Sequence, residues 1–418
     1  MSSRVVVVGQ GYVGLPLALR AVEVGYDVVA LDVNVHRIAR LRAGKSYVDD
    51  VSDAMLQAAL ETRRFLPTTS YEEAVDFAYA VVTVPTPLRD GAPDLSFIEL
   101  AMRSIAPRII PGSTVILEST TYPGTTENLA RPILEEGSGL RAGVDFHLGY
   151  SPERIDPGNP RWNFTNTPKI VSGINATSLQ MVQAFYSTLV DTVVPVSGTR
   201  EAEMAKLLEN TFRHVNIALV NELAICAHHL GIDIDEVIDA ASTKPFGFIP
   251  FRPGPGVGGH CLPVDPSYLS WEVKRTVGQS LRFVELANDI NAHMPRYVVQ
   301  RLSELLNRHR RTLSGCRVLL LGLAYKRDSG DCRESPALRV ATLLHEQDAE
   351  VWAVDNHVDP TDVPTFISLV PFDAKHIAAA DVVVLLTDHS DIDYNLLTEA
   401  SLVFDTRGRL RHANVERL

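Results

Sequence analysis

Residues 5–14 read VVVVGQGYVG, four valines that lead into three spaced glycines. A continuous β-branched run is typical of a strand that is buried on both faces of a parallel sheet. The residues that follow predict a helix over about 12–24. In this setting Gly9 allows a tight turn, Gly11 lets the backbone approach a pyrophosphate, and Gly14 lets the helix pack on the strand. The stretch therefore predicts a dinucleotide-binding domain with the pyrophosphate at a helix N-terminus.

The next predicted strand indicates which dinucleotide binds. It covers residues 27–31 and ends at Asp32. A carboxylate here accepts a hydrogen bond from a ribose 2′-hydroxyl and repels a 2′-phosphate, which favours NAD over NADP. Arg37 is a further candidate, although a solvated helix cation is its simpler interpretation. The other expected cofactor contacts are Tyr12 and Val13 in the glycine turn and Thr83, Pro85 and Thr86 at the end of another strand, where a proline-stiffened loop without a ligand is the alternative.

Alternation of strands and helices divides the chain into three predicted parts, all within the α/β class. Residues 1–196 read as an NAD-binding Rossmann-like domain with a parallel sheet. Residues 197–310 read as a central helical domain, with long helices at 199–230 and 278–309 around a proline- and glycine-rich segment. Residues 311–418 read as a C-terminal Rossmann-like α/β domain for the substrate. The later expected strands are 80–84, 114–117, 146–149, 169–171, 192–196, 316–321, 350–354, 381–386 and 402–404.

Composition narrows the classes of partner. The formal net charge is −12 and no block of Lys and Arg offsets it, which argues against nucleic acid. No apolar run is long enough to span a bilayer and no signal peptide is visible, so we expect a cytoplasmic protein without a membrane partner. Four cysteines without a C-x-x-C pair indicate a reduced protein, and the histidines show no metal-ligand spacing, so no metal site is predicted. Long apolar helices often pair across a two-fold axis, so we expect a homodimer.

One cysteine stands in a distinctive frame. Residues 253–265 read PGPGVGGHCLPVD. Glycines beside Cys261 let a bulky ligand approach, and backbone N–H groups lower the pKa of a thiol. Most free cysteines are small buried hydrophobes, and Cys226 and Cys316 keep that interpretation. For Cys261 the frame favours a nucleophile, and together with a hydride acceptor it indicates carbonyl oxidation through a covalent thiohemiacetal.

Polar residues elsewhere complete the candidate site. Residues 118–126 and 151–154 follow predicted strands, and ligands bind at the carboxyl ends of parallel strands. Lys206 and Asn210 are four residues apart on a long helix and share a face, although a solvated stripe would also explain them. Three more candidates follow the first strand of the third domain, where cations can meet a diphosphate unless they only form surface salt bridges: Tyr325, Lys326 and Arg333.

These motifs together resemble the nucleotide-sugar 6-dehydrogenases, the family of UDP-glucose, GDP-mannose and UDP-N-acetylhexosamine dehydrogenases. The most specific part is Gly258-Gly259-His260-Cys261 followed by Asp265, and the other motifs occur in the same order over essentially the whole chain. The resemblance implies a four-electron oxidation of a sugar C6 alcohol to a carboxylate with NAD. It also implies that Cys261 attacks the C6 aldehyde, that Lys206 and Asn210 stabilise the alkoxide, and that Asp265 assists as a base through water.

For the last step the resemblance implies that Glu153, with Thr121, activates the water that hydrolyses a thioester. Thr121 and Arg333 would also contact the cofactor. Arg252 or Lys244 would complete the site of a partner subunit. The implied substrate contacts are Tyr150, Glu153, Arg154, Lys206, Asn210, Arg252, Gly254, Gly256, Val257, Gly258, Tyr325 and Lys326.

The substrate is narrowed by the residues after the cysteine. Pro263 and Val264 precede the aspartate, whereas the UDP-glucose branch more often has a Lys-Asp pair and a serine before the cysteine. A UDP-hexose is therefore expected, with the bias toward a UDP-N-acetylhexosamine. The alternatives are UDP-glucose or dTDP-glucose in a specialised-metabolite pathway, a two-electron dehydrogenase of the β-hydroxyacid type, and a non-catalytic nucleotide-sugar binder. The β-hydroxyacid alternative leaves residues 315–418 unexplained.

Overall fold

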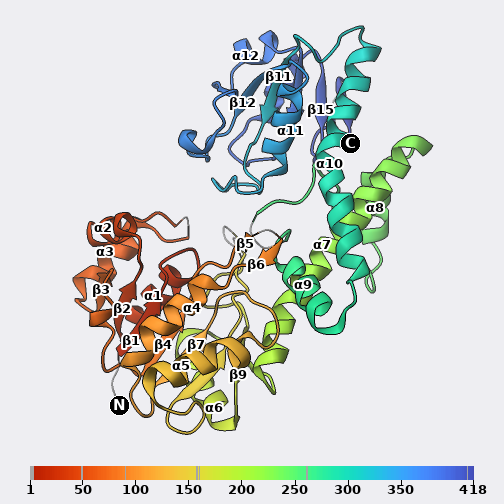
Figure 1. Cartoon of the computed structure of the whole chain (residues 1–418). Coiled ribbons are helices and arrows are strands. Elements are labelled where there is room, and N and C mark those ends of the chain that lie inside the picture. Colours follow the sequence, from red (N-terminus) through yellow and green to blue (C-terminus); the bar gives the residue numbers. More distant parts are fainter. Residues whose placement is uncertain are drawn as a thin grey trace. The chain divides into compact units, whose positions relative to one another are not determined.

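The computed structural model describes residues 4–48, 50–89, 91–156, 159, 161–259, 262–411 and 413–418. The chain forms two compact units (Figure 1). The first unit comprises Met1–Glu209 with Ser267–Arg275, and the second comprises Asn210–Pro266 with Thr276–Leu418. Helix α7 (Thr199–Leu230) has the two ends that the sequence predicted, and the division between the units falls within it. No helix of the described residues is long and apolar enough to cross a membrane.

An eight-stranded sheet forms the centre of the first unit, in the order β10-β9-β8-β7-β4-β1-β2-β3. All neighbours are parallel except β8 and β9, so the expected all-parallel sheet is wrong for that pair. The described part of residues 151–168 between these strands contains no helix, and a loop without a crossover helix can join only antiparallel neighbours. The strands are β1 (Arg4–Val8), β2 (Asp27–Leu31), β3 (Phe65–Thr68), β4 (Tyr79–Val82), β7 (Thr114–Leu117), β8 (His147–Tyr150), β9 (Lys169–Gly173) and β10 (Val193–Pro195).

The valines of β1 explain why helices cover both faces of this sheet. Val5 and Val7 belong to a core that includes residues of α1 and α6, whereas Val6 and Val8 belong to a core with residues of α4 and α5. Burial on both faces accounts for the β-branched run. The helices are α1 (Gly14–Glu23), α2 (Val35–Arg42), α3 (Asp53–Glu61), α4 (Ser96–Ile105), α5 (Arg131–Ser138) and α6 (Ala176–Leu189), and a short hairpin joins β5 (Leu88–Arg89) to β6 (Ala92–Pro93).

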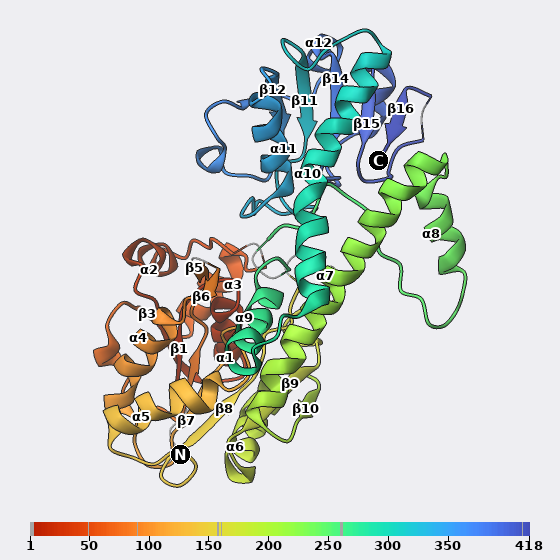
Figure 2. The same cartoon turned by 45° about the vertical axis from the view of Figure 1, so that its right-hand side comes forward.

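The second unit contains a six-stranded parallel sheet in the order β13-β12-β11-β14-β15-β16. Residues of α10 (Arg282–Arg308) and α11 (Pro336–His345) share one core with this sheet, and α8 (Ile234–Ser242) packs on α7 (Figure 2). Helix α9 (Asp265–Val277) begins at the end of the proline- and glycine-rich segment, and its residues Ser267–Arg275 belong to the first unit. The other elements are β11 (Arg317–Leu321), β12 (Glu350–Val354), β13 (Ser368–Leu369), β14 (Val382–Leu385), β15 (Val403–Asp405), β16 (Val415–Arg417) and α12 (Ala374–Ala379).

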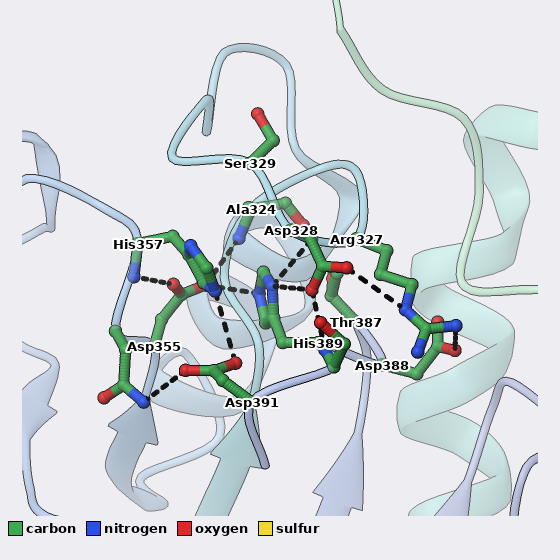
Figure 3. A network of polar contacts seen from close by, with 12 residues as sticks. Ala324, Arg327, Asp328, Ser329, Asp355, His357, Thr387, Asp388, His389 and Asp391 are labelled. Atoms are coloured by element: carbon green, nitrogen blue, oxygen red, sulfur yellow. Dashed lines mark hydrogen bonds and ion pairs between the residues drawn. The ribbon is translucent and has the colours of Figure 1, made fainter. Parts of the chain in front are cut away.

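A buried aspartate fixes the turn after β11 (Figure 3). Asp355 lies at the end of β12 with a fully buried side chain. Its Oδ2 accepts hydrogen bonds from the N–H groups of Leu323 (2.7 Å) and Ala324 (3.0 Å) and contacts His389 Nε2 at 3.1 Å. Burial opposes ionisation, but His389 and the backbone donors outweigh it and hold the pKa of Asp355 well below its usual range. The aspartate thus positions the segment that carries Tyr325.

Replacing this carboxylate should destabilise the second unit in a pH-dependent way. We expect Asp355→Asn to lower the free energy of unfolding by about 2 kcal/mol at pH 7, because buried donors lose their acceptor. A depressed pKa contributes stability above the unfolded-state value and loses it as pH falls below about 4, so the deficit should shrink in acid. Urea unfolding at pH 7 and pH 3.5 measures both deficits. Exposed Asp362→Asn is the control, and an equal deficit at both pH values would contradict the assignment.

Candidate active site

The glycine turn of the first unit has the geometry that a pyrophosphate requires. Gly9 has φ 96°, and a Cβ atom there would lie 2.7 Å from the carbonyl oxygen of Thr83. A Cβ atom at Gly14 would lie 1.9 Å from the Gly9 oxygen, whereas one at Gly11 would have no described atom within 4 Å. Packing therefore demands glycine at two positions, and the third leaves open space at the start of α1. This arrangement fits a dinucleotide phosphate.

The predicted residues around this turn have different roles in the structure. The Thr83 hydroxyl donates to the carbonyl oxygens of Gly9 (2.8 Å) and Val8 (3.0 Å), so it fastens β4 to the turn. The other predicted contacts keep accessible surface: Tyr12 and Pro85 are exposed, and Val13 and Thr86 are half-buried.

Asp32 connects the turn to the end of β2. Its carboxylate accepts hydrogen bonds from the N–H groups of Gln10 (2.9 Å) and Asn34 (2.8 Å) and lies 3.5 Å from Arg37 Nη1. The acidic residue of a dinucleotide fingerprint meets the ribose in this position. Arg37 is thus held beside the carboxylate, and its guanidinium also lies 5.6 Å from the ring centre of Tyr47.

Four buried polar side chains contact one another near the end of β8: Glu118, Glu153, Lys169 and Tyr186. Lys169 Nζ contacts Glu153 Oε2 at 3.0 Å and forms a shorter ion pair with Glu118 Oε1, and Tyr186 donates to Glu118 Oε2. Burial raises the pKa of Glu118. Burial also opposes ionisation of Glu153, but Lys169 and hydrogen bonds outweigh it and lower its pKa. Sequence analysis identified Glu153 and missed Lys169 and Tyr186, because they come from distant elements.

The loop that contains Thr121 is fastened by an acidic residue of α7. Thr121 is fully buried and donates to Thr125 Oγ1 at 2.5 Å. The Glu203 carboxylate accepts from the N–H of Gly124 (2.5 Å) and from both the N–H (2.9 Å) and the hydroxyl (2.7 Å) of Thr126. Sequence analysis assigned Glu203 no role in the site. Glu203 therefore fixes the loop that contains Thr121 without being a predicted site residue itself.

The predicted substrate residues of the first unit have contrasting environments. Lys206 is only 8% exposed, and no described residue pairs with its ammonium. Arg154 forms a bidentate ion pair with Glu209, at 2.6 and 3.2 Å. Tyr150 is fully buried in the core, so its side chain offers no accessible surface. Among these residues Lys206 is the one whose charge is available for a ligand.

In the second unit, Asn210 and Asp265 come together. Asn210 Nδ2 donates to Asp265 Oδ2 at 2.5 Å, and both side chains are almost buried. Asp265 opens α9, so the amide of α7 and the carboxylate after the cysteine frame share one location. Cys261 and His260 lie outside the described residues.

The glycine frame before the cysteine packs on the segment after β11. A Cβ atom at Gly258 would lie 2.7 Å from Tyr325 Cβ, and one at Gly259 would lie 2.6 Å from the Tyr325 ring. The Gly259 N–H donates to the carbonyl oxygen of Arg333 at 3.1 Å. Close packing within the chain therefore explains these two glycines, whereas the sequence analysis explained them by ligand approach. Lys326 follows Tyr325 and is half-buried.

The beginning of the frame reveals two residues that sequence analysis missed. The Gly254 N–H donates to Asn221 Oδ1 at 2.9 Å, and a Cβ atom at Gly254 would lie 2.6 Å from Arg407 Nη1. Gly256 has φ 131°, which favours glycine, and Val257 beside it is half-buried. An asparagine inside a helix and an arginine after β15 carry no local signal that relates them to a distant loop.

The two candidates for a partner's site are both engaged within their own chain. Arg252 pairs with Asp235 at 3.3 Å and with Asp239. Lys244 Nζ lies 5.0 Å from the ring centre of Phe246. Arg333 is exposed and pairs with Asp331 at 2.6 Å.

One cluster of described residues contains metal-ligand types. Ligand atoms of Asp328, His357, His389 and Asp391 lie within 4.8 Å of one another, although the histidine spacing predicted no site (Figure 3). His389 Nδ1 accepts the N–H of Asp328 at 3.0 Å, so Nε2 carries the proton and faces Asp355. Hydrogen bonds occupy both ring nitrogens, and we assign no metal to this network.

Comparison with known proteins identifies the family of this chain. Residues 3–190, 200–293 and 319–412 match, in this order, the NAD binding, central and UDP binding domains of the UDP-glucose/GDP-mannose dehydrogenase family. The chain belongs to this family. It is an NAD-dependent nucleotide-sugar dehydrogenase, which confirms the predicted family, fold class and cofactor.

Two relatives and one solved structure match nearly the whole dehydrogenase chain. It is 36% identical over 389 residues to a UDP-N-acetyl-D-mannosamine dehydrogenase of Pyrococcus horikoshii, covering 93% of this chain and 90% of the relative. It is 38% identical over 392 residues to a UDP-N-acetyl-D-glucosamine 6-dehydrogenase of Pseudomonas aeruginosa, covering 93% and 91%. A solved structure of UDP-D-ManNAc dehydrogenase from Pyrococcus horikoshii has a TM-score of 0.89 at 33% identity, covering 99% of this chain and 98% of that chain.

The Glu203 anchor yields a stability prediction for this dehydrogenase. Glu203→Gln replaces one acceptor oxygen by an amide, so at least one buried donor of Gly124 or Thr126 loses its partner. We expect the free energy of unfolding to fall by about 1–3 kcal/mol. Urea unfolding measures this loss, with exposed Glu201→Gln on the same helix as the control. Equal stability of the two variants would show that the carboxylate does not hold the loop.

Proposed function

We propose that this dehydrogenase oxidises the C6 alcohol of a UDP-N-acetylhexosamine to the uronic acid in two steps, through a covalent adduct on Cys261. The observation that carries the proposal is the bond between Asn210 and Asp265, four residues after Cys261 in the glycine frame. It brings an amide donor together with a carboxylate that follows the candidate nucleophile by four residues in the sequence. The names of the relatives support the sugar class, with UDP-glucose and dTDP-glucose as alternatives.

Each polar residue has a role in this scheme. Bound NAD would be held by the turn at Gly11 and by Asp32, and it supplies the hydride acceptor for both oxidations. In the first, the Asp265 carboxylate takes the proton of the C6 hydroxyl through water. The Lys206 ammonium and the Asn210 amide stabilise the negative oxygen that develops.

The second oxidation needs the thiolate. Cys261 attacks the aldehyde carbon, a C–S bond forms, and the oxygen takes a proton to give a thiohemiacetal. Loss of the hydroxyl proton and of a second hydride from this carbon, for which bound NAD would be the acceptor, leaves a thioester. Water then bonds to the thioester carbon while its proton passes to Glu153, the C–S bond breaks, and Cys261 leaves as a thiolate. The product is the carboxylate.

The stoichiometry of reduced cofactor tests this scheme. We expect about two NADH per sugar consumed, since the covalent route completes both oxidations. The assay compares UDP-N-acetylglucosamine, UDP-N-acetylmannosamine, UDP-glucose, dTDP-glucose and GDP-mannose. Cys261→Ser should stop acid formation while NAD binding, followed by fluorescence, stays intact. About one NADH per sugar, or normal acid production by Cys261→Ser, would overturn the covalent mechanism.

We also propose a homodimer that forms through α7. Phe212 and Leu219 are seven residues apart, as are Leu223 and Leu230, so the four side chains lie along one stripe. All four are exposed, with Leu219 at 50% and Leu223 at 47%. An exposed apolar stripe on a long helix is the kind of surface that a second copy covers.

Charges in the stripe should prevent dimer formation. We expect the variant Leu219→Glu/Leu223→Glu to change the mass in solution from that of two chains to that of one, because burying two carboxylates without partners is costly. Light scattering after size-exclusion chromatography measures the mass. Val237→Glu introduces the same charge at an exposed position of α8 and should leave the mass unchanged. A dimeric double variant would place the interface elsewhere.

A further inference from the structure

Lys169 joins two carboxylates in the interior of the first unit. Its side chain is only 5% exposed, and Glu118 is fully buried. Lys169 comes from β9, whereas Glu118 and Glu153 follow the ends of β7 and β8. Tyr186 of α6 donates to the second oxygen of Glu118. A buried charge persists only where partners compensate its lost hydration, so the cation and the two acids depend on one another.

The two carboxylates differ in their access to the surface. Glu153 keeps some exposed area, and its Oε1 accepts the N–H groups of Arg154 and Ile155, both at 2.6 Å. Its Oε2 is directed at the Lys169 ammonium at 3.0 Å. Both oxygens are therefore fixed by donors, and all of these donors favour the charged form. Glu118 is the counter-anchor that keeps the ammonium in place.

We propose that Lys169, held by Glu118 and Tyr186, is a positioning residue that keeps the Glu153 carboxylate ionised and oriented for the hydrolytic step. This inference rests on the proposed role of Glu153 as the base in thioester hydrolysis. Lys169 itself need not touch the substrate. It acts through Glu153, because a base must be ionised before it can take a proton from water.

The charged groups that face Glu153 set the sign of its pH dependence. Lys169 favours the charged form, and Glu118 adds a second carboxylate beside the same ammonium. Tyr186 contacts Glu118, and the guanidinium of Arg154 is turned to Glu209. Without the Lys169 cation, the largest influence that favours ionised Glu153 is lost, and burial favours the protonated form. The rate of hydrolysis should then require a higher pH, so the acidic limb of the pH profile moves upward.

The test follows thioester hydrolysis in the full-length enzyme with NAD and the sugar that gives two NADH. Rapid-quench measurement of acid formation between pH 5 and pH 9 gives the rate, and intact-protein mass spectrometry detects the adduct on Cys261. We expect Lys169→Met to move the acidic limb upward by at least about one pH unit, which lowers the rate on that limb about tenfold. Lys169→Arg keeps the cation and should restore the wild-type profile.

Three further variants separate a failure of the positioning role from misfolding and from a failure of the proposed role of Glu153. Lys169→Met/Glu118→Gln removes the cation together with its counter-anchor, so it tests the same upward shift if the single variant does not fold. Glu127→Gln, which removes a carboxylate that faces Arg200, is the control and should leave the profile unchanged. Glu153→Gln should stop the reaction at the adduct. If it does so while both Lys169→Met variants keep the wild-type profile, the positioning role is wrong. If Glu153→Gln forms acid normally, the proposed role of Glu153 itself is wrong.

Discussion

An aspartate at the end of one strand holds the turn after the neighbouring strand, and both units use this arrangement. In the first unit Asp32 accepts the N–H of Gln10, and in the second Asp355 accepts those of Leu323 and Ala324. Backbone donors at the carboxyl end of a buried strand must find acceptors once water is excluded. The carboxylate satisfies them and leaves the turn open above it. The ligand edges of both sheets depend on this interaction.

The similarity between the turns extends to their glycines and threonines. Gly9 and Gly322 both have positive φ, at 96° and 84°, and a Cβ atom on either would collide with a threonine that follows an adjacent strand of the sheet, β4 or β14. These are Thr83 and Thr387, and each hydroxyl donates to a carbonyl oxygen of the turn it faces, at 2.8 and 2.6 Å. The same set of local interactions therefore fixes the cofactor turn of the first unit and the loop after β11 in the second unit.

Features with a local cause could be predicted from the sequence. The valine run, the glycine turn and the extent of α7 follow from periodicity and backbone sterics, which neighbouring residues determine. The antiparallel pairing of β9 depends on a loop without a repeating pattern. The contacts of Lys169 join three strands and a helix, and Arg407 reaches a loop more than a hundred residues away. Such contacts depend on the tertiary fold, so spacing along the chain cannot reveal them.

The packing of the cysteine frame on Tyr325 limits how this dehydrogenase can change. Gly258 and Gly259 have no room for a Cβ atom, because Tyr325 lies beside both of them and the Glu334 carbonyl oxygen would lie 2.7 Å from a Cβ atom at Gly258. A smaller residue at position 325 would not relieve the contact with the Glu334 carbonyl oxygen, and Gly259 also has φ 80°, which favours glycine. Both positions should therefore remain glycine, and a change of substrate range in this enzyme would have to arise from residues outside the Gly258-Gly259 pair.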